Sequence, residues 1–353
     1  MPASPLLLAV DGDSLVHRAY HAMGDSEHRD SSGGAVWALR GLVTLIAGAA
    51  ARLRPDAVVV GFDSRATLDR KRAYPEYKAH RPVKAVDLLA QLEQAPGLLE
   101  AAGFPVVVAD GAEADDVLAS AASLARATGW RSTLMTSDRD SFALLDEATS
   151  VLWLRGGGVV SSPVLTAETL PEICGVRPDQ YRDYAALRGD VSDNLPGALG
   201  IGAITAARLL CAFGDLDAVF AALDEGRGDV VEAVIGTPAT ARLAGEVSRA
   251  NLERNRRLMV MDPALAMPVL DAMRLPLDGE RVRSALRARD IRLGPSLWAL
   301  VGEPMPPWFE TDGAGARGGL DGAAAHVVVL EPRWRAVSRW RPVPISADQL
   351  ALF

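Results

Sequence analysis

Short apolar runs alternate with longer helical patterns along the first 155 residues. Five runs rich in β-branched residues predict strands at residues 6–10, 57–61, 105–108, 132–135 and 151–154. Ala- and Leu-rich segments at 36–54, 86–102 and 114–127 predict helices, and Gly103 and Gly129 follow two of them, where a helix C-cap favours glycine. Strands that alternate with helices are typical of a mostly parallel α/β sheet covered on both faces.

The pattern changes near residue 166, where strand signals give way to helical segments that continue to about residue 299. Residues 311–325 read TDGAGARGGLDGAAA, a composition typical of flexible linkers. The sequence therefore predicts an α/β domain over residues 1–165, a helical domain over 166–305, and a flexible linker and C-terminal tail over 306–353.

Composition excludes several classes of protein. The chain has a net charge of −8 and two cysteines, which rules out a disulfide framework and favours the cytoplasm. No apolar stretch is long enough to span a bilayer, and the N-terminus lacks the pattern of a signal peptide. The acidic balance argues against a protein that simply coats nucleic acid, unless the acids gather in one metal site.

Acidic residues follow four of the predicted strands, and further pairs come later in the chain. The candidate metal ligands are Asp11, Asp63, Glu113, Asp115, Asp116, Asp138, Asp140, Asp190 and Asp193. Because the carboxyl ends of parallel strands lie along one edge of a sheet, we expect these carboxylates to converge. Clustered carboxylates repel one another and attract a cation, and hard oxygen ligands favour Mg²⁺ or Mn²⁺. Two such ions ~4 Å apart can cleave phosphodiesters. A single Asp after a strand is equally typical of a turn or an N-cap, so the prediction depends on the joint pattern.

Residues 65–84 form a basic segment within this acidic chain. Seven Lys and Arg residues stand against two acids, with Tyr74 and Tyr77 interleaved. Cations with aromatic rings suit phosphate contact and base stacking, although charged runs are also typical of solvated loops. The position directly after Asp63 favours a functional role.

Residues 195–210 read LPGALGIGAITAARLL. A Gly-x-Gly pair that opens a helix can present backbone N–H groups to a phosphate. The segment lacks the third glycine of a dinucleotide fingerprint and the lysine of a P-loop, so a helix–hairpin–helix that holds duplex DNA fits better. An ordinary helical turn remains an equal alternative from the motif alone.

Together these segments resemble the 5′-nuclease (flap endonuclease) family, in particular the 5′→3′ exonuclease domain of bacterial DNA polymerase I and its stand-alone relatives. The matching stretches are LLLAVDGDSLVHRAYHA, VVVGFDS, YPEYKAHRP, GAEADDVLA, TSDRDSFAL and LRGDVSDNLPGALGIGAITAARLL, in family order over about residues 5–225. The resemblance implies a PIN-like α/β domain with a helical arch at about 65–95, followed by a helix–three-turn–helix at about 185–225. It implies a structure-specific 5′→3′ exonuclease and 5′-flap endonuclease that cleaves DNA and RNA primers by a two-metal mechanism in replication and repair.

The resemblance also implies roles for individual residues. The nine acids match metal ligands, Lys78 and Arg81 match arch residues that neutralise the scissile phosphate, and Arg70 and Arg18 match phosphate contacts. Tyr77 is expected to stack on an unpaired base beside Tyr74. Gly197, Gly200 and Gly202 lie in the hairpin that holds duplex DNA, around a K⁺ ion bound by backbone carbonyls. The hairpin departs from the family pattern, since GIGAIT places isoleucine where relatives usually carry a lysine.

The last five residues, QLALF, resemble the peptide by which bacterial replication proteins bind the β sliding clamp. Gln349, Leu350, Leu352 and Phe353 would make that contact, with the linker raising the local concentration of the peptide. An apolar terminus that packs on the body is the alternative. We expect a monomeric, cytoplasmic, nucleoid-associated protein that binds branched or nicked DNA with a 5′ flap, and no membrane. A PIN-like ribonuclease and a catalytically silent DNA-binding adaptor are the alternative functions.

Overall fold

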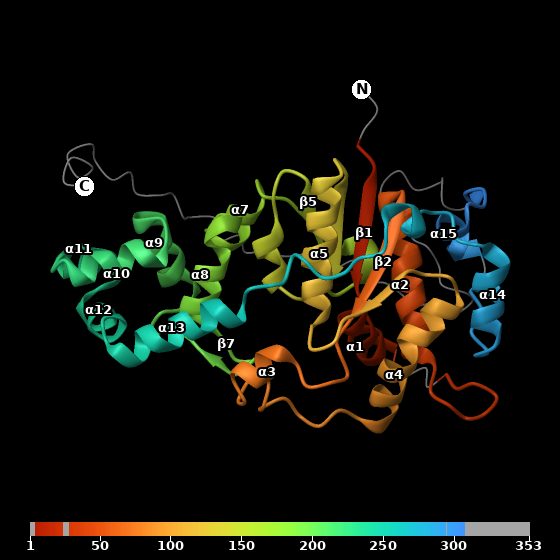
Figure 1. Cartoon of the computed structure of the whole chain (residues 1–353), viewed down its shortest axis with the longest axis horizontal. Coiled ribbons are helices and arrows are strands. Elements are labelled where there is room, and N and C mark those ends of the chain that lie inside the picture. Colours follow the sequence, from red (N-terminus) through yellow and green to blue (C-terminus); the bar gives the residue numbers. More distant parts are fainter. Residues whose placement is uncertain (1–3, 24–27, 294, 308–353) are drawn as a thin grey trace. The chain divides into compact units, whose positions relative to one another are not determined.

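A six-stranded sheet forms the centre of the structure (Figure 1). The computed structural model describes residues 4–23, 28–293 and 295–307, which lie in one compact unit. The strands are β1 (Leu6–Asp11), β2 (Ala57–Phe62), β3 (Val106–Val108), β4 (Arg131–Thr136), β5 (Thr149–Trp153) and β6 (Val164–Leu165), in the order β3-β2-β1-β4-β5-β6. All pairings are parallel except that of β6 with β5. The prediction of a mostly parallel sheet is confirmed.

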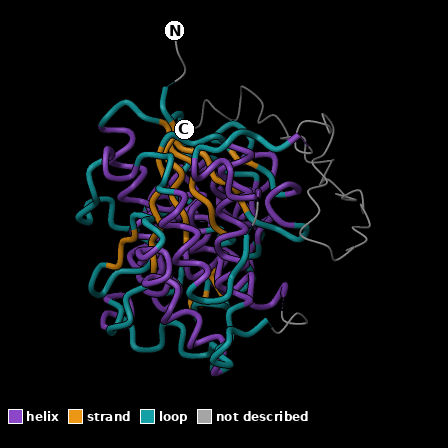
Figure 2. Tube along the Cα trace, turned by 90° about the vertical axis from the view of Figure 1, so that its right-hand side faces the viewer, coloured by secondary structure: helices purple, strands orange, loops and turns teal. Residues whose placement is uncertain are grey.

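Helices cover both faces of the sheet (Figure 2). Leu7 and Ala9 of β1 belong to a core shared with α5 (Ala114–Ala127), whereas Leu8 and Val10 belong to a core shared with α1 (Gly12–Met23), α2 (Trp37–Leu53) and α4 (Val86–Ala101). Successive strand side chains point to opposite faces, so a strand buried on both sides needs an unbroken apolar run. This requirement explains why the strands were visible in the sequence.

The basic segment contains little helix. It comprises α3 (Asp69–Ala73) and a series of turns over residues 75–80, and it ends just before α4 begins at Val86. Across the predicted arch at about 65–95, α3 and the first part of α4 are helical and turns connect them, and Lys78 adopts a positive φ of 57° within those turns.

The second half of the chain is helical but has no core of its own. Its elements include α6 (Gly158–Ser161), α7 (Leu170–Cys174), α8 (Pro178–Arg188), α9 (Ala203–Phe213), α10 (Leu216–Asp224), α11 (Gly228–Ile235), α12 (Thr237–Leu243) and α13 (Glu246–Leu258). Apolar residues of α8, α9, α10 and α13 join the core on the α5 side of the sheet. A short antiparallel pair, β7 (Gly189–Asp190) and β8 (Leu195–Pro196), connects α8 to the glycine hairpin. The sequence did not predict this pair.

The predicted helical domain does not continue to residue 305. Residues of α14 (Gly279–Arg287) and α15 (Trp298–Val301), such as Val282 and Leu300, belong to the core of α2 and α4 on the opposite face of the sheet. Helical periodicity identifies a helix but not the surface it packs on, so the sequence alone could not show this return. No described helix is long and apolar enough to cross a membrane.

Two glycines bring the hairpin close to the end of α8. A Cβ atom on Gly197 would lie 2.4 Å from the Leu187 carbonyl oxygen, and one on Gly189 would lie 2.4 Å from the Gly197 nitrogen. Gly189 also has a positive φ of 75°. Only glycine allows this approach of two backbones, which fixes the hairpin beside the β7–β8 loop.

Gly61 in β2 provides a test of how α5 is held. A Cβ at Gly61 would lie 2.6 Å from Cβ of Val117 in α5, so Gly61→Ala should push the helix away and lower the unfolding free energy by about 1–3 kcal/mol. Gly97→Ala is the matched control: that position lies within α4 with nothing within 4 Å, and alanine should stabilise the helix by about 0.5–1 kcal/mol. Urea unfolding measures both, and equal effects would contradict the packing described.

Candidate active site

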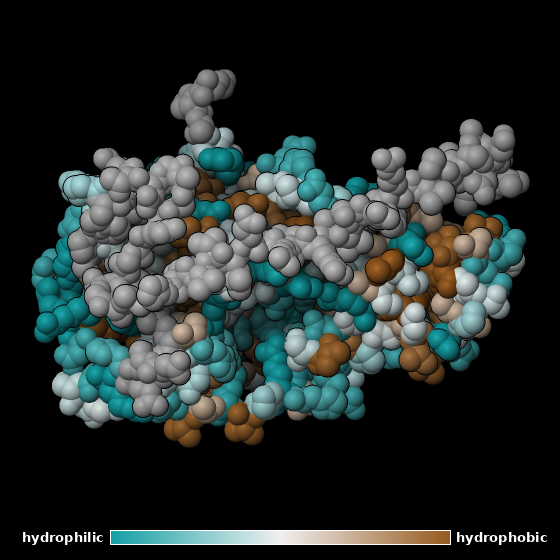
Figure 3. Space-filling model, turned by 180° about the vertical axis from the view of Figure 1, so that it is seen from behind, coloured by the Kyte–Doolittle hydropathy of each residue, from teal (hydrophilic) through white to brown (hydrophobic). Residues whose placement is uncertain are grey.

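A cavity of about 870 Å³ lies at the carboxyl edge of the sheet. Figure 3 shows a hydrophilic recess in this region. Six of the nine predicted acids line it: Asp11, Asp63, Glu113, Asp115, Asp138 and Asp190. Asp11 ends β1, Asp190 ends β7 and the other four follow β2, β3 or β4, so the convergence expected of parallel strand ends is present.

The other three acids differ from one another. Asp140 and Asp193 line a small adjoining recess together with Glu113 and Asp115. Asp116 lines neither space. Its carboxylate accepts the Glu113 N–H at 2.9 Å as part of a capping box and also pairs with Arg70. The prediction that Asp116 binds a metal is therefore not supported. Asp115 lines the cavity, whereas Asp116, the next residue of α5, caps the start of the helix.

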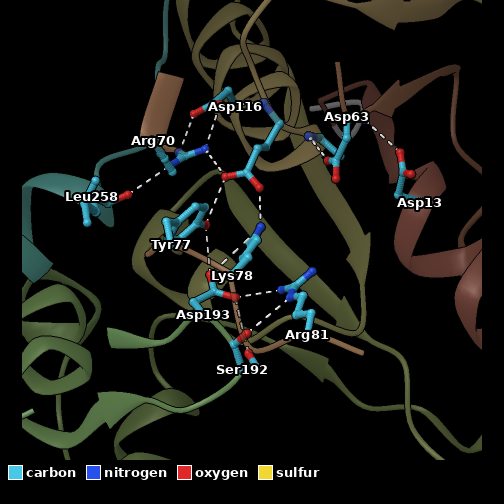
Figure 4. Close-up of polar contacts among 12 residues, drawn as sticks. Asp13, Asp63, Arg70, Tyr77, Lys78, Arg81, Asp116, Ser192, Asp193 and Leu258 are labelled. Carbon is cyan, nitrogen blue, oxygen red and sulfur yellow. Dashed lines mark hydrogen bonds and ion pairs between the residues drawn. The ribbon is translucent and has the colours of Figure 1, made fainter. Parts of the chain in front are cut away.

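Lys78 and Arg81 point into the acidic site (Figure 4). Lys78 forms an ion pair with Glu113, and Arg81 pairs with Asp193 at 2.6 Å. Backbone contacts support both, since the Lys78 N–H donates to the Asp193 carbonyl at 3.0 Å and Arg81 Nε donates to the Ser192 carbonyl at 3.2 Å. The basic segment thus lies against the β7–β8 loop with two of its cations already paired with acids.

All the N–H groups of the Arg70 side chain donate hydrogen bonds within the protein. Its five N–H donors reach Glu113, Asp116 and the carbonyls of Leu258 and Val260. No donor is left for a phosphate, so the role implied by the resemblance does not fit this structure. Arg70 instead ties the start of α5 to the segment after α13.

Tyr77 is also an internal residue. Its side chain is only 4% exposed, and the hydroxyl lies 3.0 Å from Glu113 Oε2 and 2.8 Å from Asp193 Oδ2. A single proton can be donated to only one of these carboxylates at a time. The prediction that Tyr77 stacks on an unpaired base is contradicted by this burial.

Burial and mutual repulsion raise the pKa of acids that have no ion pair with a cation in the part of the chain that the structure describes. Burial, with the charge of Asp63 added, raises the pKa of Asp11 to about 8, although the Ser14 N–H and the Thr136 hydroxyl both donate to it. Burial and then the charge of Asp13 raise the pKa of Asp63 to about 6. Burial would raise the pKa of Glu113 as well, but Lys78 and Arg70 outweigh it and hold the value below its usual range.

The oxygen donors fit a hard divalent cation. Asp115 Oδ1 is buried without a hydrogen-bond partner among the described residues, and the charges of Asp138, Asp11 and Asp140 add to the burial that raises the pKa of Asp115. Cation-free acids of this kind are what Mg²⁺ or Mn²⁺ neutralises. Within the described ranges, however, no three acidic, His or Cys side chains are arranged to hold a metal ion as they stand. Mg²⁺ usually keeps several waters and takes only one or two carboxylates directly, which is compatible with this arrangement.

Several residues of the cavity wall were not assigned from the sequence. They are Asp13, His17, Lys84, Arg139 and Arg188. Asp13 accepts the Asp63 N–H at 2.7 Å and pairs with Arg65 at 2.9 Å, which holds the segment that follows β2. The only available signal was proximity in sequence to the predicted acids.

The remaining predicted residues have the following positions. Arg18 lines the cavity and donates to the carbonyls of Leu154 and Arg155. The Tyr74 hydroxyl donates to Glu76 at 2.9 Å. Gly202 precedes α9, as the hairpin motif predicts, and Gly200 has a positive φ of 84°. Gln349, Leu350, Leu352 and Phe353 lie outside the described residues.

Comparison with known proteins agrees with these features. Residues 6–175 match the family described as 5′-3′ exonuclease, N-terminal resolvase-like domain. Residues 176–274 match the 5′-3′ exonuclease C-terminal SAM fold. The boundary between the two matches falls between α7 and α8.

Curated relatives include DNA polymerase I of Mycobacterium tuberculosis, 34% identical over 79% of this chain and 30% of the relative. The thermostable DNA polymerase I of Thermus aquaticus is 33% identical over 87% of this chain and 35% of the relative. The chain thus spans about a third of the length of these relatives.

Solved structures share the fold. T5 5′-exonuclease with bound zinc has a TM-score of 0.57 at 21% identity, covering 80% of this chain and 98% of that chain. The catalytic core of Rad2 in complex with DNA substrate has a TM-score of 0.54 at 17% identity, covering 85% of this chain and 92% of that chain.

The raised pKa of Asp11 predicts a pH dependence of stability. Between about pH 4 and 8 this acid is ionised in the unfolded chain but holds its proton in the folded protein, so stability falls as pH rises. Burial lowers the pKa of His17 to about 4, which has the opposite effect but only below about pH 6.5. Without divalent ions, the melting temperature should therefore fall from about pH 6.5 to about pH 8.

Mg²⁺ should raise the melting temperature more at the higher pH, because it binds ionised carboxylates and releases their protons. Differential scanning fluorimetry in EDTA and in Mg²⁺ measures both effects. Asp11→Asn is the control and should make the profile in EDTA less steep, while the other buried acids keep part of the slope. A Mg²⁺ shift that is the same at both pH values would contradict the described acid site.

Proposed function

The chain belongs to the 5′-3′ exonuclease family, and on that premise we propose that it is a metal-dependent nuclease that cleaves branched DNA near a 5′ end. The observation that carries this proposal is the cavity at the sheet edge, where acids from separate segments meet arch cations. Acids and cations in one hydrophilic cavity suit a phosphodiester better than an apolar substrate.

Asp11, Asp63, Asp115, Asp138 and Asp140 are the acids we propose to hold Mg²⁺. These residues have no ion pair with a Lys or Arg side chain in the described part of the chain, and each has a pKa above its usual value because of burial and neighbouring charges. Bound Mg²⁺ would lower the pKa of a water and stabilise the leaving oxygen. Ser14 and Thr136 fix the orientation of Asp11 through its two oxygens.

Lys78 and Arg81 are proposed to bind the scissile phosphate. Both are now paired with Glu113 and Asp193, and a divalent ion held by the neighbouring acids would offset the charge of these two carboxylates and free the cations for the substrate. The pKa of Lys78 is raised: burial opposes the shift, but the charges of Glu113 and Asp193 outweigh it, so the ammonium is charged at neutral pH. The arch cations would thus exchange one set of anions for another.

The glycine hairpin is proposed to hold the duplex. Gly200 and Gly202 leave the backbone at the start of α9 accessible, and a Cβ on Gly202 would meet nothing within 4 Å. Backbone N–H groups at a helix start attract phosphate, and nearby carbonyls could hold K⁺. Substrates would be DNA with a 5′ flap, nick or gap, and RNA primers paired to DNA.

Asp115→Asn tests this function. The variant should lose cleavage of a labelled 5′-flap duplex in Mg²⁺ by on the order of a thousandfold, because it removes an oxygen ligand at the reacting centre. It should melt at a higher temperature than wild type in EDTA, because an amide needs no proton to stay neutral in the buried site, whereas the carboxyl must take one up on folding; this separates lost catalysis from unfolding. Asp271→Asn, at an exposed ion pair with Arg274, is the matched control and should cut normally.

Wild-type protein that fails to cut the flap duplex in Mg²⁺ or Mn²⁺ would contradict the function. Cleavage of single-stranded RNA in preference to the flap duplex would instead favour a PIN-like ribonuclease. Normal cleavage by the Asp115 variant would move the metal site elsewhere.

We further propose that the C-terminal peptide at residues 349–353 binds the β sliding clamp. Its support is the sequence alone, a Gln, Leu and Phe pattern after a Gly- and Ala-rich linker. Deletion of these five residues should abolish capture by immobilised clamp and leave cleavage of a free flap unchanged. Replacement of Gln349 and Phe353 by alanine should have the same effect, and capture that survives both changes would disprove the interaction.

A further inference from the structure

Two arginines line the acidic cavity without joining its ion pairs. Arg139 follows Asp138, and Arg188 precedes β7 and Asp190. In the described part of the chain neither forms an ion pair with a carboxylate, and the Arg139 guanidinium has no hydrogen-bond partner. Lys78 and Arg81, in the same cavity, are both paired.

Aromatic rings hold both guanidinium groups. The Arg139 group lies 5.2 Å from the centre of the Trp153 ring, and the Arg188 group lies 5.5 Å from that of Tyr184. Both rings are buried, at 6% and 4% exposure, so they are fixed supports. Cation–π contact attracts a guanidinium to the ring face while its N–H groups remain free at the edge. Arg188 uses one of them, at 3.3 Å, on the Gly189 carbonyl.

Arg139 lies on a different side of the acids from the arch, and Arg188 directly precedes the β7–β8 segment that the arch contacts. Arg139 follows β4 and Trp153 ends β5, whereas Lys78 pairs with Glu113, which follows β3. In the sheet order, β3 is at one edge and β4 and β5 lie beyond β1. Arg139 and Lys78 therefore lie on opposite sides of the strand-end acids of β1 and β2.

We propose that Arg139 and Arg188 bind a second phosphate of the nucleic-acid strand, next to the phosphate that is cleaved. This inference rests on the proposed nuclease function and assigns a substrate contact within the same cavity. Guanidinium groups match phosphate oxygens through paired N–H donors, and a ring-supported arginine loses little rotational freedom on binding. The ligand is either an internal phosphodiester or a 5′-terminal monophosphate.

The absence of carboxylate pairing is what favours a phosphate. Asp138, Asp140 and Asp190 are close in sequence, and the charges of Asp190 and Asp140 act on Arg188 at longer range. The aromatic supports nevertheless keep both guanidinium groups out of ion pairs in the described residues. Cations left unpaired in a cavity are typical of sites that await an anionic ligand.

The test uses the full chain with Arg139→Gln, Arg188→Gln and the double variant. Binding of a 5′-flap duplex is measured with Ca²⁺ in place of Mg²⁺, and cleavage is measured with Mg²⁺. Each single change should weaken binding about tenfold and reduce the salt dependence of binding by about one counterion. The cleavage rate at saturating DNA should stay within about threefold, since the lost contact is to a phosphate that does not react.

Arg287→Gln is the matched control, because Arg287 forms an exposed ion pair with Glu280 on the outer side of α14. It should bind DNA like wild type. Unchanged affinity and salt dependence in the double variant would overturn the inference, as would a loss of cleavage rate with unchanged affinity. Melting temperatures of all variants show whether a loss of binding reflects unfolding, and Arg139→Lys keeps the charge if the glutamine variant fails to fold.

Two substrate series identify which phosphate is bound. If it is the 5′-terminal monophosphate, wild type should bind a 5′-phosphate end about tenfold better than a 5′-hydroxyl end, and the double variant should lose that preference. If it is internal, a neutral methylphosphonate beside the scissile position should weaken wild type but not the double variant. Equal effects of every modification on wild type and variant would overturn the inference. Wild type that binds DNA as described but does not cut would instead contradict only the proposed function.

Discussion

The carboxyl edge of the parallel sheet carries a concentration of negative charge that must be neutralised for the chain to fold. Asp11 is 5% exposed and Glu113 is 3% exposed, and both follow strands whose apolar sequences drive them into the interior. Burial of uncompensated carboxylates is costly, so each acid obtains protons, N–H donors or cations. The positions of the arch, the start of α5 and the β7–β8 loop can all be understood from this requirement.

Glu113 receives the most complete compensation. Lys78, Arg70 and the Tyr77 hydroxyl all reach its two oxygens, and Asp193 shares Lys78 and Tyr77 from the far side. Removal of one partner from a buried ion pair costs about 3–5 kcal/mol, because the other charge is left unpaired. The basic segment is therefore held by the same groups that a substrate would need. A divalent ion and a phosphate together supply replacement charges of both signs, which a phosphate alone cannot do.

The sequence carried enough information for five of the six strands of the sheet, for the helices α2, α4 and α5, and for the convergence of eight acids. Continuous apolar strands and their terminal acids are local patterns, and parallel topology then brings the acids together. The exceptions depend on distant contacts. Asp116 has the residue type and spacing of a ligand, yet its partners are Arg70 and Asp262, which lie far away in the sequence. Tyr77 is buried by a loop 116 residues away in the sequence, which no local pattern indicates.

The shared core links the hairpin to the cavity. Leu187, Leu195 and Ile201, around the hairpin, belong to the same buried cluster as Phe142 and Trp153, beside the acids. A closely packed interior deforms little, so the distance between the hairpin and the acids is fixed. A duplex held at the hairpin would therefore meet the acids at a fixed position along the DNA backbone. Two separate domains on a linker could not impose that spacing. Because the helical half shares its core with the sheet, the separation between the hairpin and the acids is set by packing rather than by a linker.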